Sequence, residues 1–138
     1  LYPVHVIEHG IDSALEELKI EVEKLFEVDC RLVIKKDLRD FDKSIAIHLY
    51  YITREAVFNA ARHGNPDNIR VELISNERKL SLIVEDDGCG FSEESTQQGI
   101  GLHTMKYRAK AIGARLSVQT EPGKGTRIVL RGQARAND

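Results

Sequence analysis

Apolar side chains recur with helical spacing in two long stretches of the chain. From residue 11 they lie three or four positions apart, at Ile11, Ala14, Leu15, Leu18, Val22, Leu25 and Phe26. Residues at these intervals share one face of a helix, so the pattern predicts an amphipathic helix. A second helix is predicted from about residue 41 to 63, where Gly-Asn-Pro ends it.

Alternating apolar and polar residues follow, as is typical of half-buried strands. The polar turn at 76–78 predicts an antiparallel hairpin between the two alternating runs beside it. The predicted strands are residues 30–36, 68–74, 79–86, 114–120 and 126–132.

Residues 87–101 are rich in Gly, Ser, Gln and Glu, which indicates a mobile loop. A third helix is predicted from about residue 102 to 112, with Gly113 as its stop. Helices combined with a largely antiparallel sheet indicate an α+β fold, a two-layer sandwich.

Length and composition narrow the class of protein. The 138 residues suit one domain, and no apolar run approaches the roughly 18 residues of a membrane helix. The net charge of −2 argues against nucleic-acid binding, although residues 101–138 alone carry eight basic residues against two acidic ones. Two cysteines without metal-ligand spacing argue against a disulfide scaffold or zinc site, and favour a reducing, cytoplasmic setting. Seven of the ten glycines lie between Gly88 and Gly125, which is the first indication of a binding site.

The second predicted helix places a carboxylate, an amide and a guanidinium together. At about 100° per residue, Glu55, Asn59 and Arg62 lie within roughly 60° of one another, beside an apolar face. Oxygen ligands suit a cation and a guanidinium suits phosphate. The alternative is a solvated helix face. His63, one turn beyond Asn59, either closes the helix or touches a phosphate.

Asp86 ends a row of inward-facing apolar residues on the strand 79–86. A carboxylate in that position is costly unless it meets a donor. Gly88 and Gly90 follow and allow a ligand to approach the backbone, as a pocket for a buried amine requires. The alternative is a strand end at which Asp86 and Asp87 are both solvated.

Gly99, Gly101 and Leu102 open the third predicted helix. The free N–H groups of a helix start favour an anion, and neighbouring basic residues add positive charge. The segment matches neither the Rossmann fingerprint nor a Walker loop. In the last strand Thr126 places another polar group at the rim of the same apolar wall, or is simply a β-branched strand residue.

Four motifs occur in order along the chain: Glu55-x-x-x-Asn59-x-x-x-His63, Asp86-x-Gly88-x-Gly90, Gly99-x-Gly101-Leu102 and Gly123-x-Gly125-Thr126. Together they resemble the ATP-binding domain of the gyrase, Hsp90, histidine-kinase and MutL superfamily. The segment 101–114 most resembles sensor histidine kinases of the nitrate-sensor class. The resemblance covers about residues 1–131 and implies the Bergerat-type fold, a mixed, mostly antiparallel sheet covered by three helices.

The resemblance also implies the roles of individual residues. Asp86 would accept from the adenine amine with Thr126 nearby, and Asn59 would hold Mg²⁺ with support from Glu55. The remaining implied contacts are Gly88 and Gly90 at the adenine, Gly99, Gly101 and Leu102 over the phosphates, and Arg62 and His63 as phosphate neighbours. Residues 87–101 would form the lid. Residues 1–10 would be a lead-in from an absent dimerisation domain, residues 11–131 the ATPase domain, and residues 132–138 a tail.

The implied activity is that of a protein histidine kinase domain. It would bind Mg-ATP and phosphorylate a histidine on its own dimerising helices. A further partner would be the receiver domain of a response regulator. The full-length protein would be a homodimer, with this domain cytoplasmic whether or not the parent is membrane-anchored. No histidine of this chain precedes an acidic residue as the phosphoacceptor does, so the fragment alone is expected not to phosphorylate itself. The alternatives are an anti-sigma-factor serine kinase and a nucleotide-binding regulatory module without catalysis.

Overall fold

The computed structural model describes residues 4–36, 42–91 and 96–133, with the backbone alone for 96–100. All three predicted helices and all five predicted strands are present, which confirms the two-layer α+β fold. In chain order the elements are α1 (Val4–Phe26), β1 (Asp29–Lys35), α2 (Lys43–Asn59), the π-helical turn η1 (Ala60–Gly64), β2 (Asn68–Ser75), β3 (Lys79–Asp86), α3 (Thr96–Ala111), β4 (Arg115–Thr120) and β5 (Thr126–Gln133).

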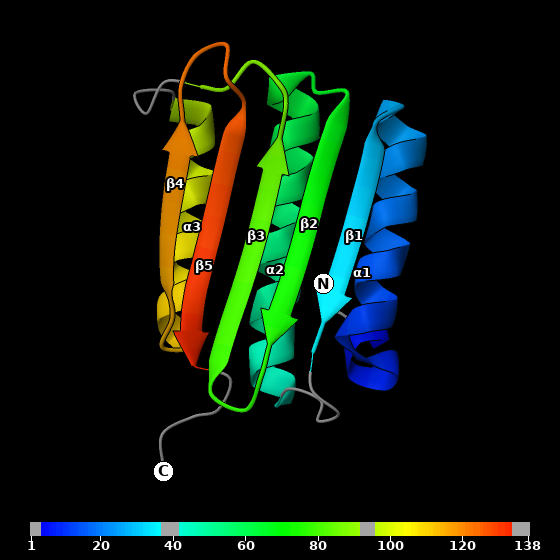
Figure 1. Ribbon diagram of the computed structural model, residues 1–138, viewed down its shortest axis with the longest axis vertical. Helices are drawn as coiled ribbons and strands as arrows, with labels where there is room; N and C mark the ends of the chain where they lie inside the picture. The colour runs from blue at the N-terminus through cyan, green and yellow to red at the C-terminus, as the bar shows by residue number, and fades with distance from the viewer. Residues whose placement is uncertain (1–3, 37–41, 92–95, 134–138) are drawn as a thin grey trace.

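The strands form one mixed sheet in the order β1-β2-β3-β5-β4 (Figure 1). The β1–β2 pair is parallel, because α2 carries the chain back across the sheet between them, and the other three pairs are antiparallel. The predicted hairpin of β2 and β3 is confirmed. Its turn is held by the side chain of Asn76, which accepts the N–H groups of Arg78 and Lys79 at 2.9 Å each.

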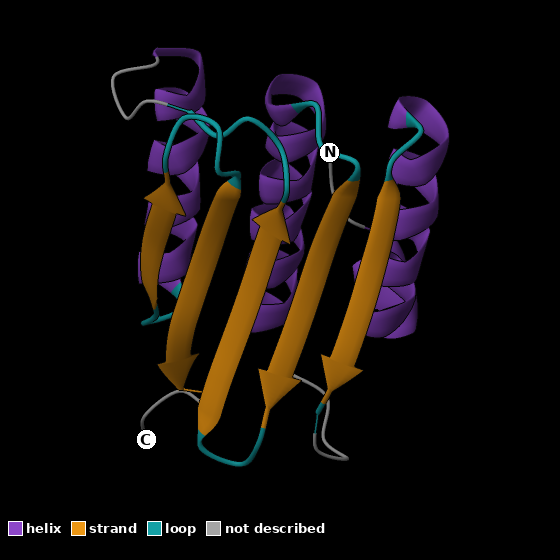
Figure 2. Cartoon of the chain, turned by 45° about the horizontal axis from the view of Figure 1, so that its top comes forward, coloured by secondary structure: helices purple, strands orange, loops and turns teal. Residues whose placement is uncertain are grey.

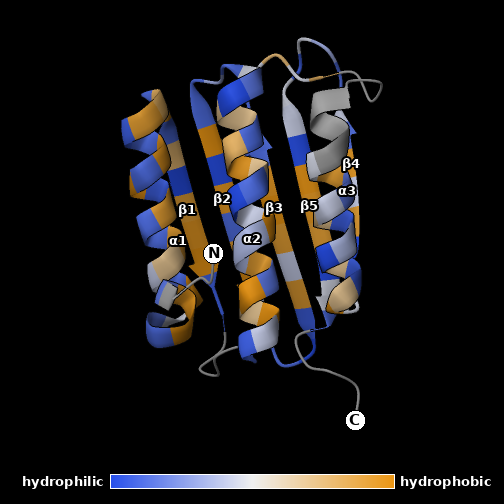
Figure 3. Ribbon diagram, turned by 180° about the vertical axis from the view of Figure 1, so that it is seen from behind, coloured by the Kyte–Doolittle hydropathy of each residue, from blue (hydrophilic) through white to orange (hydrophobic). Residues whose placement is uncertain are grey.

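The three helices lie side by side on one face of the sheet, and the other face is bare (Figures 1 and 2). Seen from the helix side, apolar residues line the strands beneath the helices (Figure 3). Alternation in β3 turns Leu80, Leu82 and Val84 into this layer, where each is at most 3% exposed. Within the described residues, no helix is both long and apolar enough to cross a bilayer.

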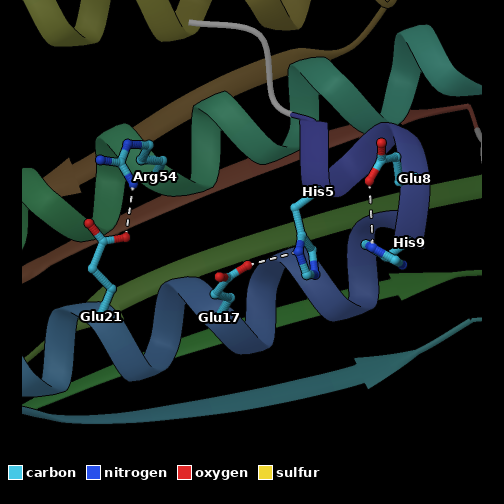
Figure 4. A network of polar contacts seen from close by, with 6 residues as sticks. All are labelled: His5, Glu8, His9, Glu17, Glu21 and Arg54. Carbon is cyan, nitrogen blue, oxygen red and sulfur yellow. Dashed lines mark hydrogen bonds and ion pairs between the residues drawn. The ribbon is translucent and has the colours of Figure 1, made fainter.

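Helix α1 starts earlier than predicted, at Val4 rather than near Ile11. The first residues lack helical periodicity because the chain bends at Gly10, whose φ of 85° and ψ of 170° interrupt the helix. Across this bend His5 Nδ1 lies 2.9 Å from Glu17 Oε2 (Figure 4). Val6 is 5% exposed and belongs to the hydrophobic core, so the part of α1 before the bend packs against the domain through this residue.

Helix α1 is docked on α2 by one ion pair and one aromatic contact. Arg54 Nη1 lies 3.2 Å from Glu21 Oε2 (Figure 4), and the rings of Phe26 and Phe58 meet edge to face at 5.8 Å. These contacts fix the helix that bears Glu55 and Asn59 against its neighbour.

Helix α3 also starts earlier than predicted, at Thr96 instead of about Leu102. Gly99 and Gly101 therefore lie inside the helix and not at its N-terminus. Glycine weakens a helix by about 1 kcal/mol, which is why the sequence suggested a loop here. Of the predicted loop 87–101, residues 92–95 fall outside the described residues.

Candidate functional site

The candidate site lies at the end of the sheet where β3 stops, β5 starts and α2 runs into η1. In this end row the inward-facing neighbours across the strands are Asp86 on β3, Thr126 on β5 and Thr120 on β4. The pocket between this row, α2 and α3 is lined by Ala56, Asn59, Ala60, Gly64, Val84, Asp86, Gly90, Phe91, Leu102, Met105, Thr126 and Ile128.

Asp86 is the half-buried acid of this pocket, on the inward face that alternation predicted. One carboxylate oxygen, Oδ1, accepts the N–H of Gly88 at 2.8 Å. Burial is the main cause that raises the pKa of Asp86, and the Gly88 bond only partly opposes it. Among the described residues no further side chain or loop N–H reaches the carboxylate, so it can accept from a ligand.

The neighbouring Asp87 has a different role. It is exposed and accepts three hydrogen bonds, from the N–H groups of Asp67 and Asn68 at 2.9 Å each and from Asn68 Nδ2 at 2.8 Å. These bonds, first the one from the Asn68 side chain, lower its pKa. Asp87 thus ties the start of β2 to the end of β3, and Asp86 alone faces the pocket.

Glycines let three loops close around Asp86. A Cβ on Gly88 would collide with the carbonyl oxygen of Gly64 and lie 2.8 Å from Asp86 Oδ1. Gly125, at a φ of 75°, packs directly against the main-chain oxygen of Asp86. The N–H of Cys89 also donates to Gly64 O at 2.8 Å. No larger residue fits at these close approaches without moving backbone.

Helix α3 lies directly on the two polar residues predicted to hold a metal. A Cβ on Gly101 would lie 2.7 Å from Asn59 Nδ2 and collide with Glu55 Oε1. The enclosed space left in the pocket is about 20 Å³, whereas ligand pockets span roughly 300–1,000 Å³. Leu102 and Met105 line the pocket from α3, so this helix fills most of the space.

The predicted site residues divide into two groups. Eight of the eleven come together at this pocket or at its wall, and of Gly99 the structure describes only the backbone, as part of α3. Arg62 and His63 do not line it. Arg62 lies over the ring of Phe58 at 5.3 Å, and the carbonyl of His63 accepts from the Cys89 thiol at 3.4 Å. The π-helical turn η1 changes the helical period after Asn59. Arg62 therefore does not share a helix face with Glu55 and Asn59, as a regular α-helix predicted.

The sequence did not identify two apolar lining residues, Phe91 and Met105. Met105 is fully buried, and an apolar residue in a predicted helix is expected in the core whether or not it lines a pocket. Phe91 directly follows Gly90, and this position beside the glycines was the one feature of the sequence that could have placed it at the pocket.

A larger hollow of about 890 Å³ lies on the bare face of the sheet. Several of its charged side chains are paired with one another: Glu85 lies 3.7 Å from Arg70 and 3.5 Å from Arg127. Asp86 and Thr126 border both spaces, but only the smaller pocket is also lined by Asn59, the residue predicted to hold the metal.

The comparisons with known proteins agree with this geometry. A sequence model of the family described as histidine kinase-, DNA gyrase B-, and HSP90-like ATPase matches residues 44–135. The chain belongs to this ATPase family. The matched range contains α2 except for its first residue, the Asp86 loop, α3 and the β4–β5 turn, and so the whole candidate site.

Similar curated proteins are the sensor proteins VraS of Staphylococcus. The one from Staphylococcus epidermidis is 34% identical over 134 residues, which are 95% of this chain and 37% of that protein. The one from Staphylococcus aureus strain COL is 33% identical over 141 residues, 100% of this chain and 40% of that protein. The chain therefore spans about two-fifths of the length of these relatives.

Solved structures show the same fold. The histidine kinase domain of a blue-light activated histidine kinase from Erythrobacter litoralis superposes with a TM-score of 0.74 at 19% identity, over 90% of this chain and 61% of that one. The ATP-binding domain of PrrB from Mycobacterium tuberculosis superposes with a TM-score of 0.68 at 20% identity, over 90% of this chain and 93% of that one.

The site residues fit the nucleotide that defines the family. The unused acceptor of Asp86 suits an amine, and the close backbone at Gly88 leaves that carboxylate reachable. Glu55 and Asn59 lie side by side against Gly101 and supply the oxygen ligands that Mg²⁺ prefers. The space of 20 Å³ does not admit a nucleotide with α3 in its present position.

Proposed function

We propose that this chain is the catalytic ATP-binding domain of a two-component sensor histidine kinase. It binds Mg-ATP and presents the γ-phosphoryl group to a histidine on a separate helical domain. The observation that carries the proposal is the half-buried Asp86 carboxylate, which has unused acceptor capacity beside Thr126 and opposite Glu55 and Asn59 of α2. The sensor proteins among the relatives support the kinase over other members of the family.

Each proposed role follows from a position in the pocket. Asp86 accepts from the adenine amine, with Thr126 beside it. Gly88 and Gly90 give the base access to the backbone. Asn59 would hold Mg²⁺, and Glu55 would support it or order water.

The phosphate side of the site involves α3 and the end of α2. Gly99, Gly101 and Leu102 would cover the phosphates with backbone N–H groups once the first turns of α3 move or unwind. We retain Arg62 and His63 as phosphate neighbours, for which Arg62 would leave the ring of Phe58.

The transfer step needs positioning and neutralisation of charge. Bound ATP would supply the phosphoryl group, and its Mg²⁺ would supply most of the positive charge around it. The residues of this chain bind the base, orient the phosphates and exclude water. The acceptor nitrogen comes from the helical partner.

The nucleotide enters only if α3 leaves Glu55 and Asn59. Gly101 packs against Glu55 Oε1 and Asn59 Nδ2, the side chains that would hold a metal. The described form is therefore a closed one, and binding has to separate the start of α3 from α2. Part of the binding free energy is used for this movement.

The proposed partners are the dimerising helices that carry the acceptor histidine and, after them, a receiver domain. The proposed location is the cytoplasm, where a buried thiol at Cys30 and an exposed one at Cys89 stay reduced. The full-length protein is proposed to be a homodimer.

Labelling with ATP that carries ³²P at the γ position tests the proposal. The domain is incubated alone and together with the histidine-bearing helical half of its own full-length protein. We expect acid-labile phosphohistidine only in the mixture. Strong labelling of the domain alone, or acid-stable phosphoserine on a small partner protein, would refute it, and the second result would indicate the serine kinase instead.

A further inference from the structure

Thr120 lies at the edge of the pocket, in the same inward-facing row as Asp86 and Thr126. Thr126 is paired with Asp86 on one side and with Thr120 on the other. Side chains directly opposite each other on neighbouring strands face the same side of a sheet. Thr120 is therefore in contact with a pocket residue without lining the pocket itself.

The hydroxyl of Thr120 joins two parts of the site. Its Oγ1 lies 2.9 Å from Thr126 Oγ1 and accepts the N–H of Phe91 at 3.0 Å. The main-chain oxygens of Gly125 and Phe91 lie 3.3 and 3.4 Å away. One side chain thus connects the threonine of the pocket, the β4–β5 turn and the residue where the segment toward α3 begins.

The number of bonds that a hydroxyl can make limits their directions to two arrangements, because either threonine can be the donor between Thr120 and Thr126. A threonine has one proton to donate and two lone pairs to accept with. The N–H of Phe91 can only donate, so it uses one lone pair. If the Thr120 proton goes to the oxygen of Gly125 or Phe91, the second lone pair accepts the proton of Thr126, and all three positions are filled.

The arrangement in which Thr126 donates to Thr120 fills every bonding position of Thr120 and determines what Thr126 offers to a ligand. With its only proton donated to Thr120, the Thr126 oxygen presents lone pairs alone to the pocket. Asp86 presents an acceptor next to it. Two adjacent acceptors match an amino group, which has two N–H donors, and they repel a carbonyl oxygen at the same place.

We infer that Thr120 is a positioning residue that sets the base specificity of this site. It holds Thr126 as a hydrogen-bond acceptor and anchors the backbone of Phe91, so that a 6-amino purine is preferred over a 6-oxo purine. The inference rests on the proposed nucleotide-binding function and assigns a role to a residue outside the pocket lining.

Two substitutions at Thr120 and one control test the inference. Thr120→Val keeps the shape and removes the hydroxyl, whereas Thr120→Ser keeps the hydroxyl. Thr53→Val is the matched control, because Thr53 is buried and its hydroxyl bonds only within α2, to Leu49 O at 2.7 Å. Should Thr120→Val fail to fold, the smaller Thr120→Ala replaces it.

The first measurement is calorimetric binding of Mg-ATP and Mg-GTP. Loss of a neutral hydrogen bond corresponds to about a 2- to 10-fold change in affinity. We expect Thr120→Val to weaken ATP binding by that factor and to narrow the ratio of ATP to GTP affinity. We expect Thr120→Ser to restore both values and Thr53→Val to leave both unchanged. Unchanged selectivity in Thr120→Val, or no rescue by serine, would overturn the inference.

The second measurement is amide hydrogen exchange without nucleotide. The Phe91 amide should exchange faster in Thr120→Val than in the wild-type, Thr120→Ser and Thr53→Val proteins. Equal exchange would overturn the anchoring role even if no nucleotide bound. A wild-type protein that binds neither nucleotide would instead refute the proposed function, so the two failures are distinguishable.

Discussion

Replacing Asp86 by Asn should weaken ATP binding and at the same time stabilise the domain. The pKa of Asp86 is raised, chiefly by burial, so the folded state prefers the protonated form. Its contribution to stability is present at low pH, below the unfolded value, and is lost as the pH rises through the folded pKa. At pH 7 the ionised Asp86 therefore costs folding free energy. Asn has the same shape without the charge, and its oxygen can still accept from Gly88.

The effect on binding has the opposite sign. A hydrogen bond to a carboxylate contributes about 1.5–3 kcal/mol, so its loss should raise the Kd for Mg-ATP about 10- to 150-fold. Calorimetry measures the affinity, and thermal unfolding followed by circular dichroism measures Tm. We expect a higher Tm than wild type at pH 7 and a difference that disappears toward the pH at which Asp86 is protonated.

Asp87→Asn is the matched control, one residue along the same strand end. The pKa of Asp87 is lowered by its bonds from Asn68 and Asp67, so its stabilising effect is present above the unfolded pKa and is lost on acidification. Asn at 87 loses at least the bond from Asn68 Nδ2. We expect a free energy of unfolding lower by about 1 kcal/mol, and so a lower Tm, with unchanged ATP affinity. If Asp86→Asn lowers Tm, or binds ATP as tightly as wild type, the assignment of Asp86 fails.

Three further predictions concern the rest of the site. Asn59→Ala should abolish most of the Mg²⁺ dependence of nucleotide binding, and calorimetry with and without the ion would show an unchanged dependence if Asn59 is no ligand. Gly101→Ala should loosen the start of α3, because its Cβ would collide with Glu55, and amide exchange in α3 should become faster; equal protection would contradict the contact. Thiol titration of the native protein should modify Cys89 but not Cys30, whose pKa burial raises to about 11, until the chain unfolds; two fast thiols would contradict the burial.

Much of the fold was predictable because most of its elements bury one regular face. Leu80, Leu82 and Val84 repeat with the period of a strand, and the helices after Ile11 and near Ile52 repeat with that of a helix. The start of α3 was not predictable from this signal. Residues 96–101 include two glycines and no apolar face, and the close packing of Gly101 against α2 is a tertiary contact.

The site was predictable where it depends on motifs and less so where it depends on geometry. The inward face of Asp86 followed from alternation alone, which left open whether the carboxylate is solvated there. The departure of Arg62 did not, because nothing in the local sequence marks the π-helical turn after Asn59. Thr120 was missed because its importance lies in four contacts with residues that are distant in the chain or across a turn. Strand periodicity does not predict such contacts.

The most direct test of the central claim is to titrate the ¹⁵N-labelled wild-type domain with Mg-ADP and follow the backbone amide shifts by NMR. The account predicts saturable shifts that are largest at Asn59, Gly88, Gly90 and Thr126, with further changes along the start of α3. The absence of shifts, or shifts centred on the bare face of the sheet around Arg70, would contradict it.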